Sequence, residues 1–167
     1  MNFLIGPLTS GSRSADAGLL LLRVVAGASL AAAHGLGKMP PRQRFVERVG
    51  AMGFPEPEVF AWLSGFAELG GGLLLAIGLF TRPAAFLIAA NFVVVVLLAH
   101  QGDPFGDREK GLLFLSIAAL YLFTGAGRFS LDAMLFGGSR ALPPGSSYET
   151  TLESAGRGIP RSDPLHQ

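Results

Sequence analysis

Residues 59–80 read VFAWLSGFAELGGGLLLAIGLF, and this stretch decides the fold because it is apolar except for the carboxylate of Glu68 near its middle. A helix of this length reaches about 33 Å at about 1.5 Å per residue, slightly more than the hydrocarbon core of a bilayer. The stretch therefore predicts a membrane-spanning helix with Glu68 deep inside it. A charge at that depth persists only where it faces the bundle interior and has a partner or a proton.

Three further apolar stretches predict helices at residues 17–36, 83–100 and 111–124, the last extended backward through Glu109. The link Thr81-Arg82-Pro83 is so short that the second and third helices should form an antiparallel hairpin, with Pro83 in the first helical position. We therefore expect an all-α, integral membrane four-helix bundle with both termini on the same side. The positive-inside rule does not decide its orientation, because basic residues are similarly frequent on both sides.

The predicted domain organisation has three parts. Residues 1–16 form an N-terminal segment, residues 17–136 form the four-helix transmembrane domain, and residues 137–167 form a disordered tail rich in Gly, Pro and Ser. The first apolar stretch resembles a signal peptide, but Arg23 interrupts it, which favours a retained helix. Residues 41–49 predict a short amphipathic helix, lying either in the headgroup layer or in a solvated loop.

The composition excludes several classes of function. Half of the residues are hydrophobic and only 15% are charged, which is typical of a membrane protein. A formal net charge of +1 gives no broad basic surface for nucleic acid. The absence of cysteine excludes dithiol chemistry, thiolate metal sites and iron–sulfur clusters held by this chain alone. Any redox role must use a bound molecule or another subunit.

Ionisable residues of the predicted helices form a candidate intramembrane cluster. At 100° per residue, Arg23, His34 and Lys38 share one face of the first helix. Depth is counted at about 1.5 Å per residue from the side that bears the termini. His34, His100 and Glu109, from three different helices, lie at roughly 24 to 25 Å. Glu68 lies at roughly 18 Å and Asn91 at roughly 12 Å. Glu68 is expected to pair with His34 or Arg23. The candidate ligand or proton site consists of Arg23, His34, Lys38, Glu68, His100 and Glu109.

Other interpretations of these residues stay open. Arg23 and Lys38 could extend to the headgroups from the helix ends. His34 and His100 could be axial ligands of a haem, and with Glu109 they could hold a metal, but neither a porphyrin pocket nor a local ligand spacing supports this. No built-in cofactor or metal site is expected. The small residues around Glu68 indicate close packing of a neighbouring helix.

A series of short motifs resembles the DoxX family of small bacterial membrane proteins. The resemblance runs in order from about residue 18 to residue 132. It rests on Leu21-Leu22-Arg23, His34-Gly35 with Lys38, Gly53-Phe54-Pro55, Phe66-Ala67-Glu68 with Gly71-Gly72, Gly78-Leu79-Phe80-Thr81-Arg82, His100, Glu109 and Gly125-x-Gly127-Arg128-x-Ser130-Leu131-Asp132. It implies a four-helix bundle in the bacterial inner membrane, related to subunits of quinol oxidases and thiosulfate:quinone oxidoreductases. It also implies that the six residues of the candidate cluster would carry the function.

The leading hypothesis is an accessory or quinone-interacting subunit of a membrane redox system. A quinone headgroup would enter near His34, His100 and Glu109, and Glu68 would handle protons. Partner oxidoreductase subunits and a homo-oligomer are compatible with this role, and whether the chain is itself catalytic stays open. The alternatives are a non-catalytic membrane scaffold or assembly partner, and a proton-coupled transporter of small solutes.

Overall fold

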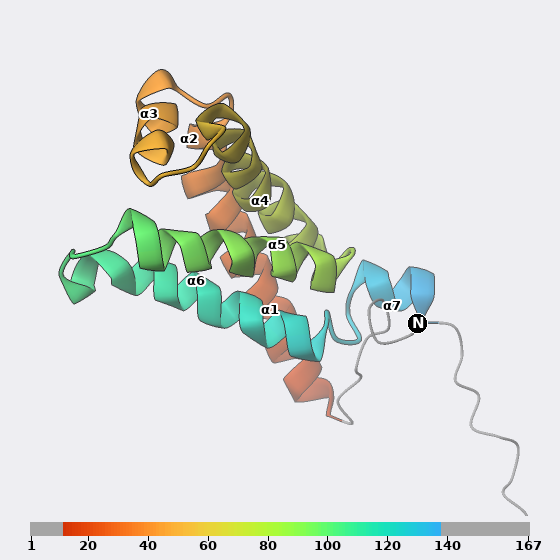
Figure 1. The fold of residues 1–167 in the computed structure, drawn as a ribbon. Coiled ribbons are helices and arrows are strands. Elements are labelled where there is room, and N and C mark those ends of the chain that lie inside the picture. Colours follow the sequence, from red (N-terminus) through yellow and green to blue (C-terminus); the bar gives the residue numbers. More distant parts are fainter. Residues whose placement is uncertain (1–11, 138–167) are drawn as a thin grey trace, which may run out of the picture.

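A computed structural model describes residues 12–137, and this part of the chain consists of helices and the links between them, with no strand (Figure 1). Two segments, η1 and η2, have the wider turn of a π-helix. The predicted tail and the first eleven residues lie outside the described part. The elements are α1 (Arg13–Ser29), η1 (Leu30–Gly35), α2 (Leu36–Lys38), α3 (Gln43–Ala51), α4 (Pro57–Ile77), α5 (Thr81–Val94), η2 (Val95–Ala99), α6 (Phe105–Thr124) and α7 (Leu131–Phe136).

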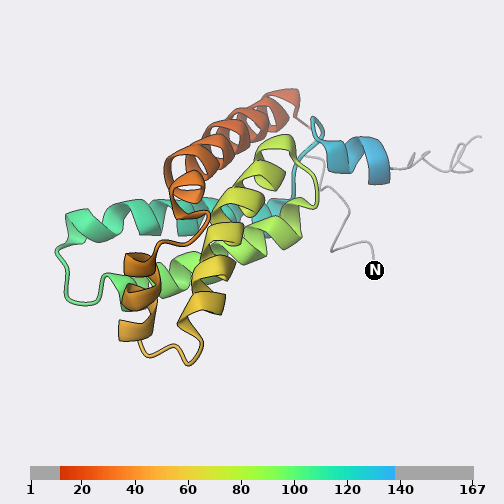
Figure 2. The same ribbon diagram turned by 90° about the horizontal axis from the view of Figure 1, so that it is seen from above.

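Within residues 12–137, three continuous helical segments are long and apolar enough to cross a membrane: Arg13–Lys38, Pro57–Ile77 and Thr81–Ala99. Helix α6 runs beside α5 in both views (Figures 1 and 2), but its first turn carries charged residues at positions 107–110. The prediction of an all-helical fold is confirmed for the described residues, and three of the four predicted crossings are candidate membrane spans. The fourth crossing and the common side of the termini stay predictions.

Polarity is distributed as in a protein surrounded by lipid. Large apolar side chains point outward, including Leu21 at 67% exposed and Phe123 at 67% exposed. By contrast, some charged side chains within the helices are enclosed: Arg23 and Glu68 are each only 2% exposed. Because a soluble domain would expose its charges and bury such apolar groups, the outer surface fits a bilayer as its solvent.

Helices α1 and α4 approach so closely that only glycine fits at the contact. A Cβ atom on Gly27 would lie 2.5 Å from the carbonyl oxygen of Gly72, and one on Gly72 would lie 2.8 Å from the carbonyl oxygen of Gly27. Both obstacles are backbone atoms, which cannot rotate away. This is the small-residue packing that brings membrane helices together, and it places α2 and its Lys38 against α4.

The segment after α6 closes one end of the bundle. The carboxylate of Asp132 accepts hydrogen bonds from the backbone N–H groups of Phe80 at 2.7 Å and Thr81 at 2.9 Å, at the start of α5. The guanidinium of Arg23 donates to the carbonyl oxygens of Ala126 and Phe129 in the same segment. These bonds satisfy backbone groups that helix ends and turns leave open. Arg23 of α1, the α4–α5 turn and the segment leading into α7 therefore meet at this end.

The predicted position of the α4–α5 turn was wrong. The turn is Gly78-Leu79-Phe80, and Thr81 to Pro83 already belong to α5. Helix α4 ends at Gly78 because this residue adopts a left-handed backbone conformation, with φ of 70°, that glycine tolerates best. The carboxylate of Asp132 then replaces the missing hydrogen bonds at the start of α5 and moves its beginning ahead of Pro83.

Replacing Gly72 with Ala should destabilise the protein by about 1–3 kcal/mol, because the added methyl group meets the backbone of α1. Gly70 is the matched control on the same helix, since a Cβ there has no atom within 4 Å. Gly70→Ala should change stability by less than about 1 kcal/mol, in the stabilising direction. Thermal unfolding in a mild detergent checks both variants. Equal stabilities for the two would contradict the close helix contact.

Candidate functional site

A buried carboxylate joins the three candidate membrane-spanning segments. Lys38 Nζ, at the end of the first segment, donates a hydrogen bond to Glu68 Oε1 on α4 at 2.6 Å. Asn91 Nδ2 on α5 donates to the same oxygen at 3.0 Å. Glu68 is 2% exposed, whereas the side chain of Lys38 is 24% exposed. The ion pair therefore has a buried acid and a base that reaches toward the outside.

The second oxygen of Glu68 is buried and has no hydrogen-bond partner among the described residues. A buried carboxylate oxygen without a donor is costly, so such an atom usually marks a proton, a water molecule or a function. Because Oε1 already accepts from Lys38 and Asn91, Oε2 is the carboxylate atom that is left without a donor.

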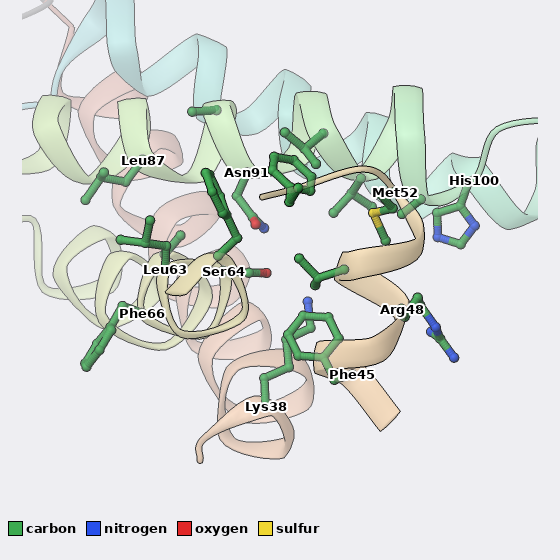
Figure 3. Close-up of a pocket in the computed structure, with 18 residues that line it drawn as sticks. Lys38, Phe45, Arg48, Met52, Leu63, Ser64, Phe66, Leu87, Asn91 and His100 are labelled. Atoms are coloured by element: carbon green, nitrogen blue, oxygen red, sulfur yellow. The ribbon is translucent and has the colours of Figure 1, made fainter. Parts of the chain in front are cut away.

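A pocket of about 450 Å³ lies beside this network, between α3, α4 and α5. In the close-up, the polar ends of Lys38, Ser64 and Asn91 point toward a common space from α2, α4 and α5 (Figure 3). Most of the remaining wall is apolar. It includes Phe45, Val49, Met52, Phe54, Phe60, Leu63, Phe66, Ala67, Leu87, Ala90, Val94, Val95 and Ala99.

The two edges of the pocket differ in polarity. Leu63, Phe66 and Leu87 are 56%, 56% and 51% exposed, so the edge between α4 and α5 opens onto the apolar outer surface of the protein. Arg48 and His100 line the opposite edge, and both reach solvent at least in part (Figure 3). The pocket thus has an apolar side facing the expected lipid and a basic side facing the expected headgroup region.

Helix α3 forms one wall of this pocket. The predicted amphipathic helix is present at Gln43–Ala51, and Phe45 and Val49 from its apolar face line the cavity. The ammonium group of Lys38 lies 5.1 Å from the centre of the Phe45 ring, a cation–π distance. Helix α3 therefore covers the Lys38 end of the network.

Of the other residues of the predicted cluster, His100 lines the pocket, whereas Arg23, His34 and Glu109 lie elsewhere. Arg23 is at the end of the bundle closed by α7. The ring of His34 contacts Phe114 of α6 edge to face, with centroids 5.7 Å apart. His100 Nδ1 hydrogen-bonds Asp103 Oδ2 at 2.8 Å, and Glu109 is exposed. Among residues 12–137, no three His, Asp or Glu side chains are placed to hold a metal ion.

The expectation that Glu68 pairs with His34 or Arg23 was wrong. Its partner is on the first helical segment, as expected, but it is Lys38. The projection at 100° per residue assumed an uninterrupted α-helix, whereas η1 has a wider turn and changes the angle between Arg23 and the residues that follow. The three basic residues contact different elements: Arg23 contacts the segment after α6, His34 contacts α6, and Lys38 contacts α4.

Two features of the site were missed by the sequence reasoning. Asn91 was placed near Glu68 by its depth but was left out of the cluster, although an amide in an apolar helix is itself a signal of a polar contact. The pocket could not be found, because it depends on α3 folding back over α4. The apolar face of α3 was the available signal for this contact.

The ion pair predicts an order of stabilities. Lys38→Met should cost about 3–5 kcal/mol, because it leaves a buried carboxylate without its counter-charge. Glu68→Ala should cost about 1–3 kcal/mol, since the remaining lysine is partly exposed and can turn toward water. Glu68→Gln keeps a hydrogen-bond acceptor and should cost less than Glu68→Ala.

Thermal unfolding in detergent measures this order. Glu109→Ala is the control, because Glu109 is an exposed carboxylate whose removal should change stability by less than about 0.5 kcal/mol. If Lys38→Met were as stable as the Glu109→Ala control, the buried ion pair would not hold the helices together.

Comparison with known proteins identifies relatives of this chain. The DoxX family profile matches residues 18–101. A Bacillus subtilis protein named "Putative oxidoreductase CatD" is 30% identical over 130 residues, covering 77% of this chain and 95% of the relative. The Escherichia coli protein named "Inner membrane protein YqjF" is 30% identical over 129 residues, covering 72% of this chain and 93% of the relative. The Escherichia coli protein named "Inner membrane protein YphA" is 30% identical over 123 residues, covering 68% of this chain and 88% of the relative.

No solved structure matches the chain. The family profile covers the α1, α4 and α5 segments and ends just after His100, so it includes all three members of the Lys38–Glu68–Asn91 network. Since the match spans half of the chain and the relatives are covered over most of their length, the chain belongs to the DoxX family of membrane proteins.

Proposed function

We propose that this protein is a bacterial inner-membrane component of a redox system that holds a quinone-type molecule in the pocket between α3, α4 and α5. The observation that carries the proposal is the pocket itself, which joins an apolar opening toward lipid to a polar floor at Lys38 and Asn91. Relatives named as an oxidoreductase and as inner membrane proteins support both the location and the redox setting.

The size and chemistry of the pocket fit such a molecule. A cavity of about 150 Å³ suffices for benzene, so a pocket of about 450 Å³ has room for a substituted ring and the start of an apolar tail. Small-molecule sites are typically apolar clefts with a few well-placed polar groups. Because the chain has no cysteine, electrons would have to come from the bound molecule or from a partner subunit.

Glu68 is not part of the pocket wall, so we propose that it exchanges protons with the bound molecule through Lys38, which lines the pocket and is bonded to Glu68 Oε1. Its free Oε2 atom can accept a proton while Oε1 remains bonded to Lys38 and Asn91. Reduction of a quinone consumes protons and oxidation of a quinol releases them, so a carboxylate next to the pocket would serve either direction. A pure scaffold would need neither the pocket nor the free oxygen.

The quinone prediction is tested by filling the pocket. Ala90 lines the pocket, whereas the exposed Ala32 lies elsewhere on the first segment, so Ala90→Trp and Ala32→Trp form a matched pair. After mild-detergent purification, mass spectrometry of the extracted lipids should find a quinone with the wild type and with Ala32→Trp. Its amount should fall by about tenfold or more with Ala90→Trp, since a bulky ring excludes the ligand. Equal retention by both variants would refute the proposed site.

We also propose that α6 is the fourth crossing, so that both ends of the described chain lie on one side. Its twenty residues reach about 30 Å at about 1.5 Å per residue. Its outward side chains are apolar, with Leu113 59% and Phe123 67% exposed. The charged first turn can reach the headgroups, as charged side chains near helix ends do.

The absence of native cysteine allows a direct topology measurement. Single cysteines replacing the exposed residues Ser14, Gln101 and Arg128 can be labelled with a reagent that does not cross the membrane. Ser14→Cys and Arg128→Cys should react from the same side, and Gln101→Cys from the opposite side. Labelling of Gln101→Cys and Arg128→Cys from one side would show that α6 does not cross.

A further inference from the structure

The floor of the pocket has a specific hydrogen-bonding character. Lys38 Nζ carries three N–H donors, and among the described residues only Glu68 accepts one of them. An ammonium group has no acceptor capacity, so a ligand atom that hydrogen-bonds Lys38 Nζ beside the Phe45 ring must be an acceptor. Asn91 has one N–H engaged with Glu68 and lines the same space.

Glu68 fixes both donors in position. It lies outside the pocket wall, and its Oε1 atom accepts from Lys38 at 2.6 Å and from Asn91 at 3.0 Å. Two donors on one oxygen lie close together, so a ligand oxygen in front of them could receive a hydrogen bond from each. A lysine side chain is otherwise flexible, and such pre-organisation lowers the entropy cost of binding.

We propose that Lys38 and Asn91 form the headgroup site of the pocket, where they hydrogen-bond a ring carbonyl oxygen of the ligand, with Glu68 as the residue that positions both. This inference rests on the proposed function and adds the specificity: the site selects a ring that carries a carbonyl acceptor over a hydrocarbon ring of the same shape. The apolar wall, including Phe45 and Ala90, holds the rest of the ring.

Two probes separate the headgroup site from the apolar wall. Duroquinone is a fully methylated benzoquinone, and durene is the same methylated ring without the carbonyl groups. Duroquinone also has no free ring position for addition of a lysine amine. Equilibrium dialysis against the protein in nanodiscs, with empty nanodiscs subtracted, gives the affinity for each. Wild type should bind duroquinone on the order of tenfold more tightly than durene, the effect of a charge-assisted hydrogen bond.

The test variant is the double substitution Lys38→Met and Glu68→Gln, which removes the ammonium group without leaving a buried charge unpaired. Durene binding should be unchanged, which shows that the pocket is intact, and the preference for duroquinone should fall to near one. Asn91→Leu should reduce the preference severalfold. Glu68→Ala should reduce the preference for duroquinone although Lys38 is still present. Glu68→Gln should keep most of this preference, as expected if Glu68 positions Lys38 and Asn91.

The failures of the two proposals are distinguishable. If Ala90→Trp abolishes binding of both probes but the double variant keeps the full preference for duroquinone, the headgroup site is refuted while the pocket stands. If neither probe shows binding that Ala90→Trp removes, the proposed function and the headgroup site both fail. A preference that falls in the double variant with durene binding intact supports both proposals.

Discussion

The carboxylate of Glu68 is the constraint on which the rest of this structure depends. An ionised group that is 2% exposed in an apolar bundle needs a counter-charge and further hydrogen bonds. Lys38 and Asn91 supply them, and each belongs to a different candidate membrane-spanning segment. The need for these partners therefore fixes the relative positions of three helical segments. The Gly27–Gly72 contact lets α1 and α4 approach closely enough for Lys38 to reach Glu68.

The same requirement shapes the pocket. Lys38 has to reach inward from the end of its helix, and the chain then turns into α3, whose apolar face closes over the lysine. The space left between α3, α4 and α5 has the polar network as its floor and lipid-facing side chains at one edge. The hydrogen bonds of Arg23 and Asp132 stabilise the opposite end of the bundle, so they do not constrain the end where the pocket lies.

The sequence predicted the helices well because apolar length and turn residues are local signals. The inward position of Glu68 also followed from its energetic cost alone. The partner could not be predicted, since the π-helical turn of η1 alters the angular relation between Arg23 and Lys38 and leaves no clear pattern in the sequence. The α4–α5 turn was displaced because Asp132, about fifty residues away, caps α5. A local change of helix type decides the first point, and a contact between distant segments decides the second.

A double-mutant cycle between Lys38 and Glu68 tests the central claim most directly. The unfolding free energies of wild type, Lys38→Met, Glu68→Gln and the double variant give the coupling between the two side chains. A direct buried ion pair predicts a coupling of about 1–3 kcal/mol, with the double variant more stable than Lys38→Met alone. Additive effects, with a coupling below about 0.3 kcal/mol, would mean that the two side chains do not interact in the membrane protein.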